Sequence, residues 1–508
     1  MEEMHKRPDS NEKKVEEIKS KVFNWLKEPY NLALVLIMIF AFAIRLYYFW
    51  ITRNQALWWD ELAYGSLARN FVTHLWDGTP AIVGEIYLRP LIFSYLWAFL
   101  FYLGFGEIVN RFLLAFIPSV ISVYLVYLIG AEVYNKKIGL IAAAIFSVIW
   151  LNLFYSSRFL VHMVEMVFLF SSMYFFIKST KNQINLKQFS ISLVLLSFAT
   201  LTRYQDGLAF IVYFVIIILA KKLYLNKLKF WYAGIIGMSP LLLFFLMNFL
   251  TKGNIFPTLL TGTYIHAATK IPFGFHLLNF IPLFLTIPIF LFFILGLAYL
   301  IFDIVLGYNL LSENPVRRNG LFLILIMLVF FSFFIFYLRA AEDRYFFEIL
   351  ASLTIISAFG INFCADYIKK YNKTLAIVFI IGILLFGAYQ EYKQADPLIK
   401  QKEESYAQMR AAFLWLKENT PTDSVVAGSG TSAYSIYYSE QVYSDLGNDY
   451  SLEETLKIDK SDYLVRHGFT PEPPYINEYF ASHESKFEVV HYELYQGQPI
   501  VIVYKALK

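Results

Sequence analysis

The amino-acid sequence predicts an α-helical polytopic membrane protein with a small C-terminal α/β domain outside the membrane. Hydrophobic residues make up 58% of the 508 residues and charged residues only 16%, against about 45–50% and about 25% in a soluble domain. The apolar residues form long runs up to about residue 395, where the composition becomes more polar. These features exclude a disordered chain and an ordinary cytosolic enzyme. The single cysteine, Cys364, excludes a disulfide scaffold and a thiolate metal site.

Residues 1–30 are polar and rich in charge, and they lack the pattern of a secretory signal. They are expected to form a partly helical cytoplasmic tail. The first apolar run, 31–51, is long enough to cross the ~30 Å hydrocarbon core as a helix. Ten further spans are expected at 110–131, 138–156, 159–177, 188–202, 207–220, 230–250, 277–302, 320–338, 345–364 and 373–390. The short apolar segment 90–104 is expected in or near the interface, and about 11–13 transmembrane helices are predicted in all.

The charged residues between the spans predict the orientation in the membrane. With the N-terminus in the cytoplasm, one side collects mostly lysines, including the pairs at 136–137, 221–222 and 369–370. Such an excess of cations is typical of cytoplasmic loops. The other side holds fewer cations, nearly all of them arginines at the ends of different spans. Arginine binds anions through paired hydrogen bonds, so we expect an anion site on this extracytoplasmic side. The chain as a whole is expected to be a multi-pass cell-membrane protein.

The C-terminal segment is expected to form a soluble extracytoplasmic domain. A helix is expected at 406–419, and short strands are expected at 424–427, 463–465, 487–491 and 499–504. The predicted organisation is a tail at 1–30, a transmembrane domain at 31–394 with a first outer loop at 52–109, and this α/β domain at 395–508. No internal repeat, Gly-rich phosphate loop or zinc-ligand spacing occurs in the sequence.

The first outer loop contains the sequence WWDE at 58–61, in which Asp60 and Glu61 are the acidic pair. The apolar positions that follow, at 64–75, have the spacing of an amphipathic helix on the membrane surface. One interpretation is structural: Asp60 caps this helix, and Glu61 favours its dipole. The other is functional: Asp60, with or without Glu61, is a general base held beside the lipid headgroups. The local pattern leaves both interpretations open.

Five arginines near the outer ends of predicted spans could complete a site with this acidic pair: Arg89, Arg111, Arg158, Arg203 and Arg344. Any one of them can be explained by snorkelling to the headgroups or by pairing with an acidic neighbour. His162 and Glu165 lie inside the span that begins near Arg158. An ionisable pair within a membrane helix indicates a functional site, and the alternative is a structural hydrogen bond to a neighbouring helix.

Taken together, these residues resemble the motifs of the GT-C membrane glycosyltransferases, in particular the group of protein O-mannosyltransferases and lipid A aminoarabinose transferases. The motifs of that group correspond here to Asp60-Glu61 in the first outer loop, Arg89-Pro90, Arg111 at the start of a span, Thr202-Arg203, and Arg344-Tyr345 near the last spans. The resemblance covers about residues 30–365 in order and spacing. Residue 89 is arginine where the group usually has lysine, and only one proline follows it. The WWDYG signature of the related oligosaccharyltransferases is absent.

The resemblance implies a GT-C fold and an inverting glycosyltransferase. Such an enzyme moves one sugar, mannose or a similar one, from a polyprenyl-phosphate (for example dolichyl-phosphate) donor to a hydroxyl of a protein, glycan or lipid on the extracytoplasmic face. By that resemblance Asp60 is the base and Glu61 positions Asp60 or the acceptor. Arg89, Arg203 and Arg344 are the leading phosphate contacts, with Arg158 and Arg111 as further candidates, and Glu165, His162 and Tyr345 are possible accessory residues.

The expected partners are the lipid-linked donor, the hydroxyl acceptor and the bilayer, with no nucleic acid. The scheme requires no cofactor, and the Asp60/Glu61 pair would suit a hard divalent cation if a metal binds. Two other classes remain open. A transporter or flippase of lipid-linked sugars would also need outer arginines, but it would usually show charges near mid-membrane and paired broken spans. A membrane scaffold that binds through its outer domain would not need the arginines.

Overall fold

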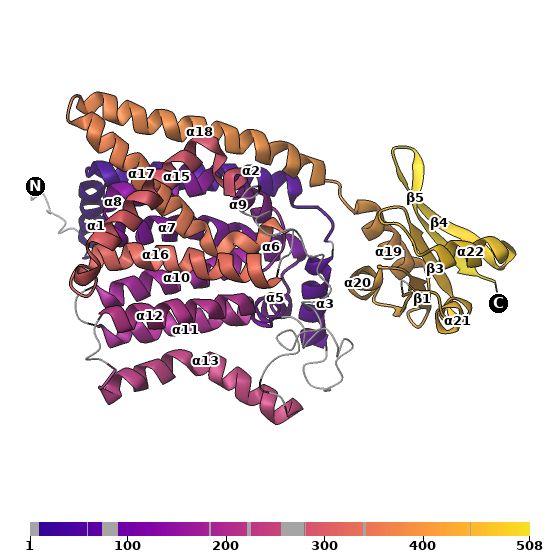
Figure 1. The fold of residues 1–508 in the computed structure, drawn as a ribbon. Coiled ribbons are helices and arrows are strands. Elements are labelled where there is room, and N and C mark those ends of the chain that lie inside the picture. Colours follow the sequence, from indigo (N-terminus) through magenta and orange to yellow (C-terminus); the bar gives the residue numbers. More distant parts are fainter. Residues whose placement is uncertain are drawn as a thin grey trace, which may run out of the picture.

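The computed structural model describes residues 10–57, 59–73, 90–181, 184–220, 225–253, 255, 279, 281–338, 342–447 and 449–507. Most of the chain forms a bundle of helices that run side by side (Figure 1). A second, smaller unit lies beyond one end of this bundle and is joined to it by the last long helix (Figure 1). The polytopic helical class with a small C-terminal α/β domain is therefore confirmed.

The bundle is built from the expected spans. Its helices are α2 (Pro29–Thr52), α6 (Glu107–Arg111), α7 (Ile117–Val133), α8 (Lys136–Val148), α9 (Trp150–Ser156), α10 (His162–Thr180), α11 (Leu186–Thr202), α12 (Ala209–Ala220), α13 (Leu228–Lys252), α15 (Ile281–Leu306), α16 (Pro315–Ser332), α17 (Leu350–Lys369) and α18 (Lys373–Lys402). Among the described residues, eight helical stretches are long and apolar enough to cross a membrane, or up to nine if one bent pair counts as a span. Three shorter apolar helices accompany them.

Local sequence explains where several of these helices begin. Asparagine precedes four of them, and each side chain accepts a hydrogen bond from a backbone N–H of the first turn: Asn135 before α8, Asn185 before α11, Asn314 before α16 and Asn372 before α18. A helix leaves its first N–H groups without partners, so such a cap stabilises the start of the helix. The charged tail forms α1 (Ser10–Leu26), as expected from its partly helical pattern.

One span is broken. Helices α8 and α9 meet at Ile149 with a bend of 57°. The bend leaves carbonyl groups of α8 and N–H groups of α9 without helical partners, and two buried charged side chains take up some of them. Arg45 Nη1 in α2 donates to the Ser147 carbonyl at 2.9 Å. Glu391 in α18 accepts from the Trp150 N–H at 2.8 Å. A guanidinium donor thus lies at the carboxyl end of α8, and a carboxyl acceptor lies at the amino end of α9.

The segment predicted as the first outer loop contains α3 (Asp60–Thr73), which packs against α5 (Ile92–Tyr102). The prediction of a helix on the membrane surface is wrong in one respect: residues 61–68 are all buried. The reason is that protein covers this helix from several directions. The Ser94 hydroxyl of α5 donates to the Tyr64 carbonyl at 3.2 Å, and the C-terminal domain lies over the same helix.

The C-terminal domain contains a five-stranded mixed sheet in the order β2-β1-β3-β5-β4. Its strands are β1 (Val425–Gly428), β2 (Val442–Asp445), β3 (Tyr463–His467), β4 (Phe487–Tyr495) and β5 (Gln498–Ala506). The four strands expected from the sequence are confirmed, and β2 is an additional edge strand. Helices α19 (Ala407–Asn419), α20 (Ser432–Tyr434), α21 (Leu452–Lys460) and α22 (Pro474–Ser482) surround the sheet. The expected division at residue 395 falls inside α18, which continues to Lys402.

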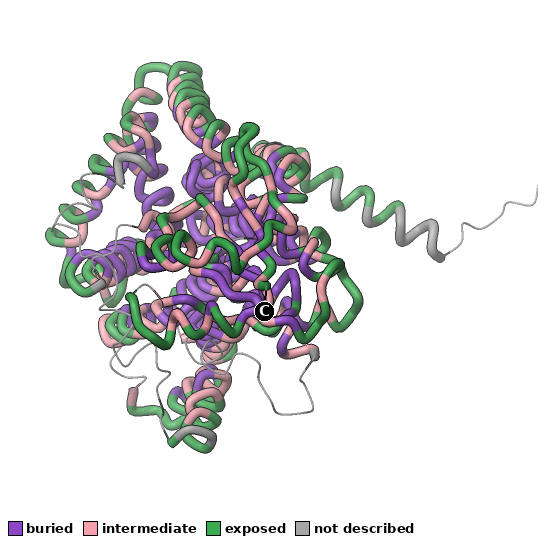
Figure 2. The backbone as a smooth tube through the Cα atoms, turned by 90° about the vertical axis from the view of Figure 1, so that its right-hand side faces the viewer, coloured by how far each residue is buried: buried purple, intermediate pink, exposed green. Residues whose placement is uncertain are grey.

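The two units are in contact. Arg69 Nη1 of α3 donates to the Tyr437 carbonyl at 2.6 Å and lies 2.7 Å from Oε1 of Glu440. The Leu57 N–H donates to the Tyr438 hydroxyl at 3.0 Å. Gly65 lies against the rings of Trp97 and Tyr437, where an added Cβ atom would come within 2.7 Å of both. Figure 2, which looks onto this end of the molecule, shows the buried segments gathered in the centre and the exposed ones around them.

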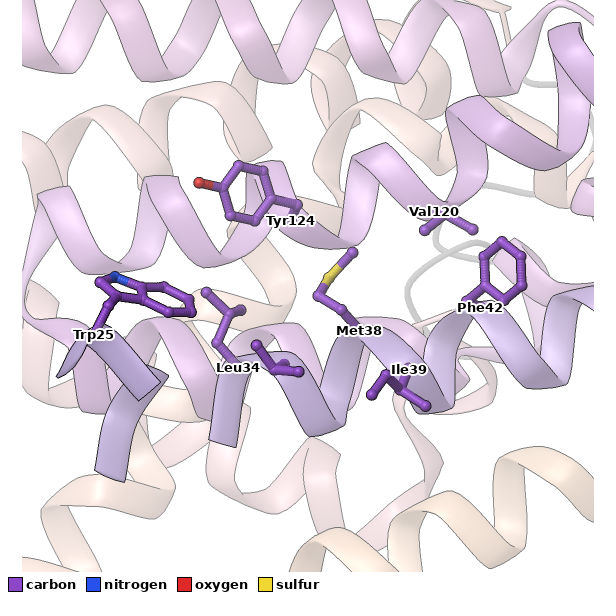
Figure 3. Close-up of a pocket in the computed structure, with 8 residues that line it drawn as sticks. Trp25, Leu34, Met38, Ile39, Phe42, Val120 and Tyr124 are labelled. Carbon is purple, nitrogen blue, oxygen red and sulfur yellow. The ribbon is translucent and has the colours of Figure 1, made fainter. Parts of the chain in front are cut away.

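An apolar groove of about 440 Å³ runs along α2 on the outside of the bundle (Figure 3). Its lining residues come from α1, α2 and α7: Trp25, Leu34, Val35, Met38, Ile39, Phe42, Val120 and Tyr124. No charged side chain is among these lining residues. The groove therefore has an apolar lining, whereas the region around Asp60 is charged.

Candidate active site

Asp60 is the first residue of α3 and is partly open to solvent. Its Oδ2 lies 2.6 Å from Nη1 of Arg344, which is 284 residues away in the sequence. Arg344 belongs to the short 3-10 helix Asp343–Ile349 that leads into α17, and its Nε lies 2.6 Å from Oε2 of Glu342. The side chains of Asp60 and Arg344 keep 30% and 22% of their surface exposed. An ion pair this accessible can be reached and rearranged by a ligand.

Glu61, the next residue, has a different environment. Its Oε1 lies 2.9 Å from Nε of Arg158 and accepts a hydrogen bond from the Phe159 N–H at 2.8 Å. Both charged side chains are at most 2% exposed. Burial lowers the pKa of Arg158, and the neighbouring Glu61 carboxylate opposes that shift. Glu61 therefore anchors the start of α3 to the 157–161 connection and is shielded from a ligand.

The C-terminal domain contributes an aromatic side chain next to this pair. Tyr434 of α20 is buried and lies close enough to interact electrostatically with Glu61 and Arg158. Burial raises the pKa of Tyr434 above its usual range, so the phenol stays neutral. Its hydroxyl has no hydrogen-bond partner among the described residues. Tyr434 of the C-terminal domain thus forms part of the surroundings of Glu61 and Arg158.

Arg203 lies in a buried cluster of acids. Its Nη1 is 2.7 Å from Glu348 Oε1 and 3.2 Å from Glu165 Oε2. The carboxylate oxygens of Glu165, Asp206 and Glu348 lie within 4.8 Å of one another. Three carboxylates at this spacing could hold a metal ion, but the Arg203 guanidinium already lies between two of them. A metal ion there would compete with Arg203 for these two carboxylates, and one guanidinium balances the charge of only one of the three acids.

The same test applies to the acidic pair at 60–61. Oδ2 of Asp60 faces Arg344, and Oε1 of Glu61 faces Arg158 together with a backbone N–H. A hard divalent cation prefers a set of oxygen ligands. A metal at Asp60/Glu61 would therefore have to compete with Arg344 for Asp60 and with Arg158 for the buried Glu61 carboxylate.

The remaining predicted residues lie as follows. Arg111 is buried beside Glu107 at 3.0 Å, donates to the Gln55 carbonyl and is close enough to Arg158 for mutual repulsion. His162 Nδ1 lies 3.4 Å from Oε2 of Glu165, and the His162 ring stacks on Phe347. Tyr345 stacks on Phe334, and its ring faces the guanidinium groups of Arg203 and Arg344 at about 6 Å. Arg89 lies outside the described residues.

The structure thus gathers Asp60, Glu61, Arg111, Arg158, Arg203 and Arg344 at one end of the bundle. Sequence reasoning missed the carboxylate of Glu348 as a partner of Arg203, and it missed the bond from the Tyr155 hydroxyl to Asp343 at 2.8 Å. It also missed Arg45 and Glu391. A signal exists in the sequence for Arg45, which is an isolated charge inside the apolar run 31–51, because such charges are costly unless they have a function or a partner. Glu391 follows the expected span and lies near Lys393 and Asp396, so the sequence gives no such signal for it.

The comparisons with known proteins agree with this fold. Residues 88–247 match the model of the dolichyl-phosphate-mannose-protein mannosyltransferase family. No match was found among curated protein sequences. Among solved structures, ArnT from Cupriavidus metallidurans matches with a TM-score of 0.65 and 12% identity over 93% of this chain and 97% of ArnT.

Two other solved structures share the architecture. The oligosaccharyltransferase of Archaeoglobus fulgidus matches with a TM-score of 0.61 and 13% identity, over 87% of this chain and 70% of that protein. The arabinofuranosyltransferase AftD from Mycobacteria matches with a TM-score of 0.54 and 12% identity, over 92% of this chain and 40% of AftD. All three are GT-C glycosyltransferases. The chain therefore has the GT-C fold, and the resemblance inferred from its motifs is confirmed.

Proposed function

We propose that the protein is an inverting glycosyltransferase. In this proposal it moves a single sugar from a polyprenyl-phosphate donor to a hydroxyl of a protein, glycan or lipid on the extracytoplasmic side of a cell membrane. The matched family model is that of a dolichyl-phosphate-mannose-dependent enzyme. ArnT has been solved bound to undecaprenyl phosphate, and the Archaeoglobus enzyme bound to dolichol-phosphate and an inhibitory peptide. These ligands support a lipid phosphate as the donor carrier here.

The observation that carries the proposal is the contrast between the two neighbouring acids. Glu61 is sealed in a buried ion pair, whereas Asp60 is 30% exposed and contacts an arginine that is also accessible. A general base must reach the proton it removes. Asp60 meets this requirement, and Glu61 is placed to hold Asp60 at the start of α3.

The proposed reaction needs one base and one anion site. The acceptor hydroxyl oxygen attacks the anomeric carbon while its proton passes to the Asp60 carboxylate. The bond between the anomeric carbon and the phosphate oxygen breaks, and the polyprenyl phosphate leaves with the electron pair. Attack opposite to the leaving group inverts the anomeric centre. The leaving group is a phosphate and already a stable anion, so no strong general acid is required.

Arg344 is the proposed first contact of the donor phosphate. Guanidinium groups bind phosphate through paired, charge-assisted hydrogen bonds and stabilise the charge that develops as the bond breaks. A phosphate that engages Arg344 would also release Asp60 from its ion pair, which makes the carboxylate free to act as base. Arg89 remains a further proposed contact. Arg203, Arg158 and Arg111 are weaker choices, because each is buried and already faces a carboxylate.

The test uses purified full-length protein in lipid nanodiscs with radiolabelled polyprenyl-phosphate-mannose and related donors. Acceptor-dependent transfer of the label is expected from the native chain. Asp60→Asn is expected to lower that rate by about 10²–10⁴-fold, because it removes the base. The matched control is Asp366→Asn, which alters a carboxylate at the other end of α17 that pairs with Lys137 at 3.1 Å.

Each outcome has a defined meaning. Equal loss of activity in both variants would point to a general defect and would contradict the assignment of Asp60. Unchanged turnover in Asp60→Asn would reject it as the base. If the protein in sealed proteoliposomes instead moves the intact labelled lipid across the membrane without bond cleavage, the protein is a flippase and not a transferase.

A further inference from the structure

A cavity of about 420 Å³ lies where the last long helix meets the C-terminal domain. Its wall is formed by the residues that link α18 to α19 and by two aromatic residues of the domain: Lys400, Gln401, Lys402, Glu403, Glu404, Ser405, Tyr406, Gln408, Phe469 and Tyr495. Its volume falls within the range of about 300–1,000 Å³ that is typical of small-molecule sites. It is distinct from the ion pairs around Asp60 and is half-open to solvent.

The lining combines aromatic rings with charged and amide side chains. The rings of Tyr406 and Phe469 lie 4.9 Å apart, and Tyr495 is 47% exposed at the end of β4. Glu403 and Glu404 are exposed carboxylates on the linker. A sugar has an apolar face of C–H groups and a rim of hydroxyls. Aromatic rings pack against the C–H face of a sugar, and carboxylate and amide groups form hydrogen bonds with its hydroxyls. A lipid tail would not use the charges.

A hydrogen bond links this cavity to the residue that precedes the candidate base. The indole N–H of Trp59 donates to the Tyr406 hydroxyl at 3.3 Å, and Trp59 immediately precedes Asp60. Both residues have left-handed backbones, with φ of 47° at Trp59 and 61° at Tyr406. Bulky residues adopt this conformation only where the surroundings enforce it, and such positions concentrate at ligand sites.

We propose that this cavity is the acceptor subsite of the transferase and that the acceptor part it binds is a carbohydrate. The inference rests on the proposed function in its use of Asp60 as the base. In this arrangement the rings of Tyr406, Phe469 and Tyr495 hold the sugar while Trp59 and Tyr406 fix the position of the cavity relative to Asp60. An acceptor hydroxyl that reaches the base would then come from a glycan or glycolipid.

Binding is tested first without any reaction. Saturation-transfer NMR on the full chain in nanodiscs uses mannobiose, chitobiose and lactose as probes. At least one disaccharide is expected to bind, and Phe469→Ala and Tyr495→Ala are each expected to weaken it at least tenfold. The matched control is Tyr492→Ala, because Tyr492 is a 54% exposed aromatic on the same strand as Tyr495 and does not line the cavity. Tyr495→Ala alters a half-exposed side chain, so its fold is expected to be retained.

The kinetic test separates this inference from the proposed function. With a glycan acceptor, Tyr495→Ala is expected to raise the acceptor KM at least tenfold, whereas the control Tyr492→Ala is expected to leave the acceptor KM unchanged. Absence of any donor turnover in the native chain would contradict the proposed function. The binding data would still show whether the cavity binds a carbohydrate. Three results overturn the inference: no disaccharide binds, binding is the same in Tyr495→Ala, or a peptide acceptor is used with a KM that this variant does not alter.

Discussion

Two neighbouring carboxylates illustrate how burial decides chemistry at the scale of single residues. Asp60 and Glu61 are adjacent in the sequence and have the same formal charge. The helical turn directs them to different surroundings: Glu61 into a buried pair with Arg158, and Asp60 to an accessible pair with Arg344. Removal of one member of a buried pair leaves the other charge without compensation. The two acids are therefore expected to respond differently to the same substitution.

Glu61→Gln is expected to destabilise the protein by about 3–5 kcal/mol, because it leaves the Arg158 guanidinium buried without its counter-charge. Asp60→Asn is expected to cost about 1 kcal/mol or less, since exposed ion pairs contribute little. Thermal unfolding of both variants in nanodiscs measures the difference. Combining Glu61→Gln with Arg158→Met is expected to restore part of the lost stability. A larger loss for Asp60→Asn than for Glu61→Gln would contradict this interpretation.

At the scale of elements, the broken span α8–α9 positions the residues that anchor the site. The chain passes from α9 directly to Arg158 and Phe159, which hold Glu61. The break is supported by charges from two other spans, Arg45 and Glu391. Both are buried, and the second carboxylate oxygen of Glu391 has no hydrogen-bond partner among the described residues. An isolated buried charge is tolerated here because it satisfies backbone groups that the bend exposes.

Glu391→Leu is expected to lose about 1–3 kcal/mol, the cost of leaving the buried Trp150 N–H without an acceptor. Glu391→Gln is expected to retain most of the stability, because an amide oxygen can accept the same hydrogen bond. Denaturation in detergent, with activity measured in parallel, tests both. Tyr389→Leu is the control, since Tyr389 is 60% exposed on the same helix. Equal stability of Glu391→Leu and Tyr389→Leu would show that the cap at Trp150 is unimportant.

At the scale of the whole molecule, the C-terminal domain completes the region around the acidic pair. It places Tyr434 beside Glu61 and Arg158, and it covers the helix that begins with Asp60. Arg69 is the main polar link, since it contacts both the Tyr437 carbonyl and Glu440, and its guanidinium lies 4.2 Å from the centre of the Tyr437 ring. The linker at 403–406 is the natural place for the two units to separate.

Arg69→Ala is expected to loosen the domain from α3, because it removes the hydrogen bond, the ion pair and the cation–π contact together. Limited proteolysis and hydrogen exchange across residues 400–410 measure the effect, and a several-fold faster cleavage is expected. Lys505→Ala, an exposed change on β5, is the control. Cleavage at the same rate in both variants would mean that Arg69 does not hold the domain.

Much of the fold could be predicted from the sequence because hydropathy acts locally. Each of the eleven expected spans overlaps helices of the bundle, and four strands of the terminal sheet were expected within a few residues. Strand β2 was missed because it is a four-residue edge strand of mixed polarity. The buried state of α3 was missed because amphipathic spacing reports one apolar face, whereas the covering domain lies more than 300 residues further along the chain. No local pattern records that contact.

The sequence by itself predicted the apolar helices of the bundle, although only eight or nine helical stretches of the described residues are long and apolar enough to cross a membrane, against the 11–13 expected. It also predicted the small C-terminal α/β domain and the residue types of the candidate site. It could do so because transfer of apolar side chains from water and the preference of arginine for anions depend on each residue's own chemistry. Only the tertiary structure decided which acid faces which arginine: Asp60 with Arg344, Glu61 with Arg158, and Arg203 with Glu165 and Glu348. Those pairings join distant segments, and packing of the whole bundle fixes them.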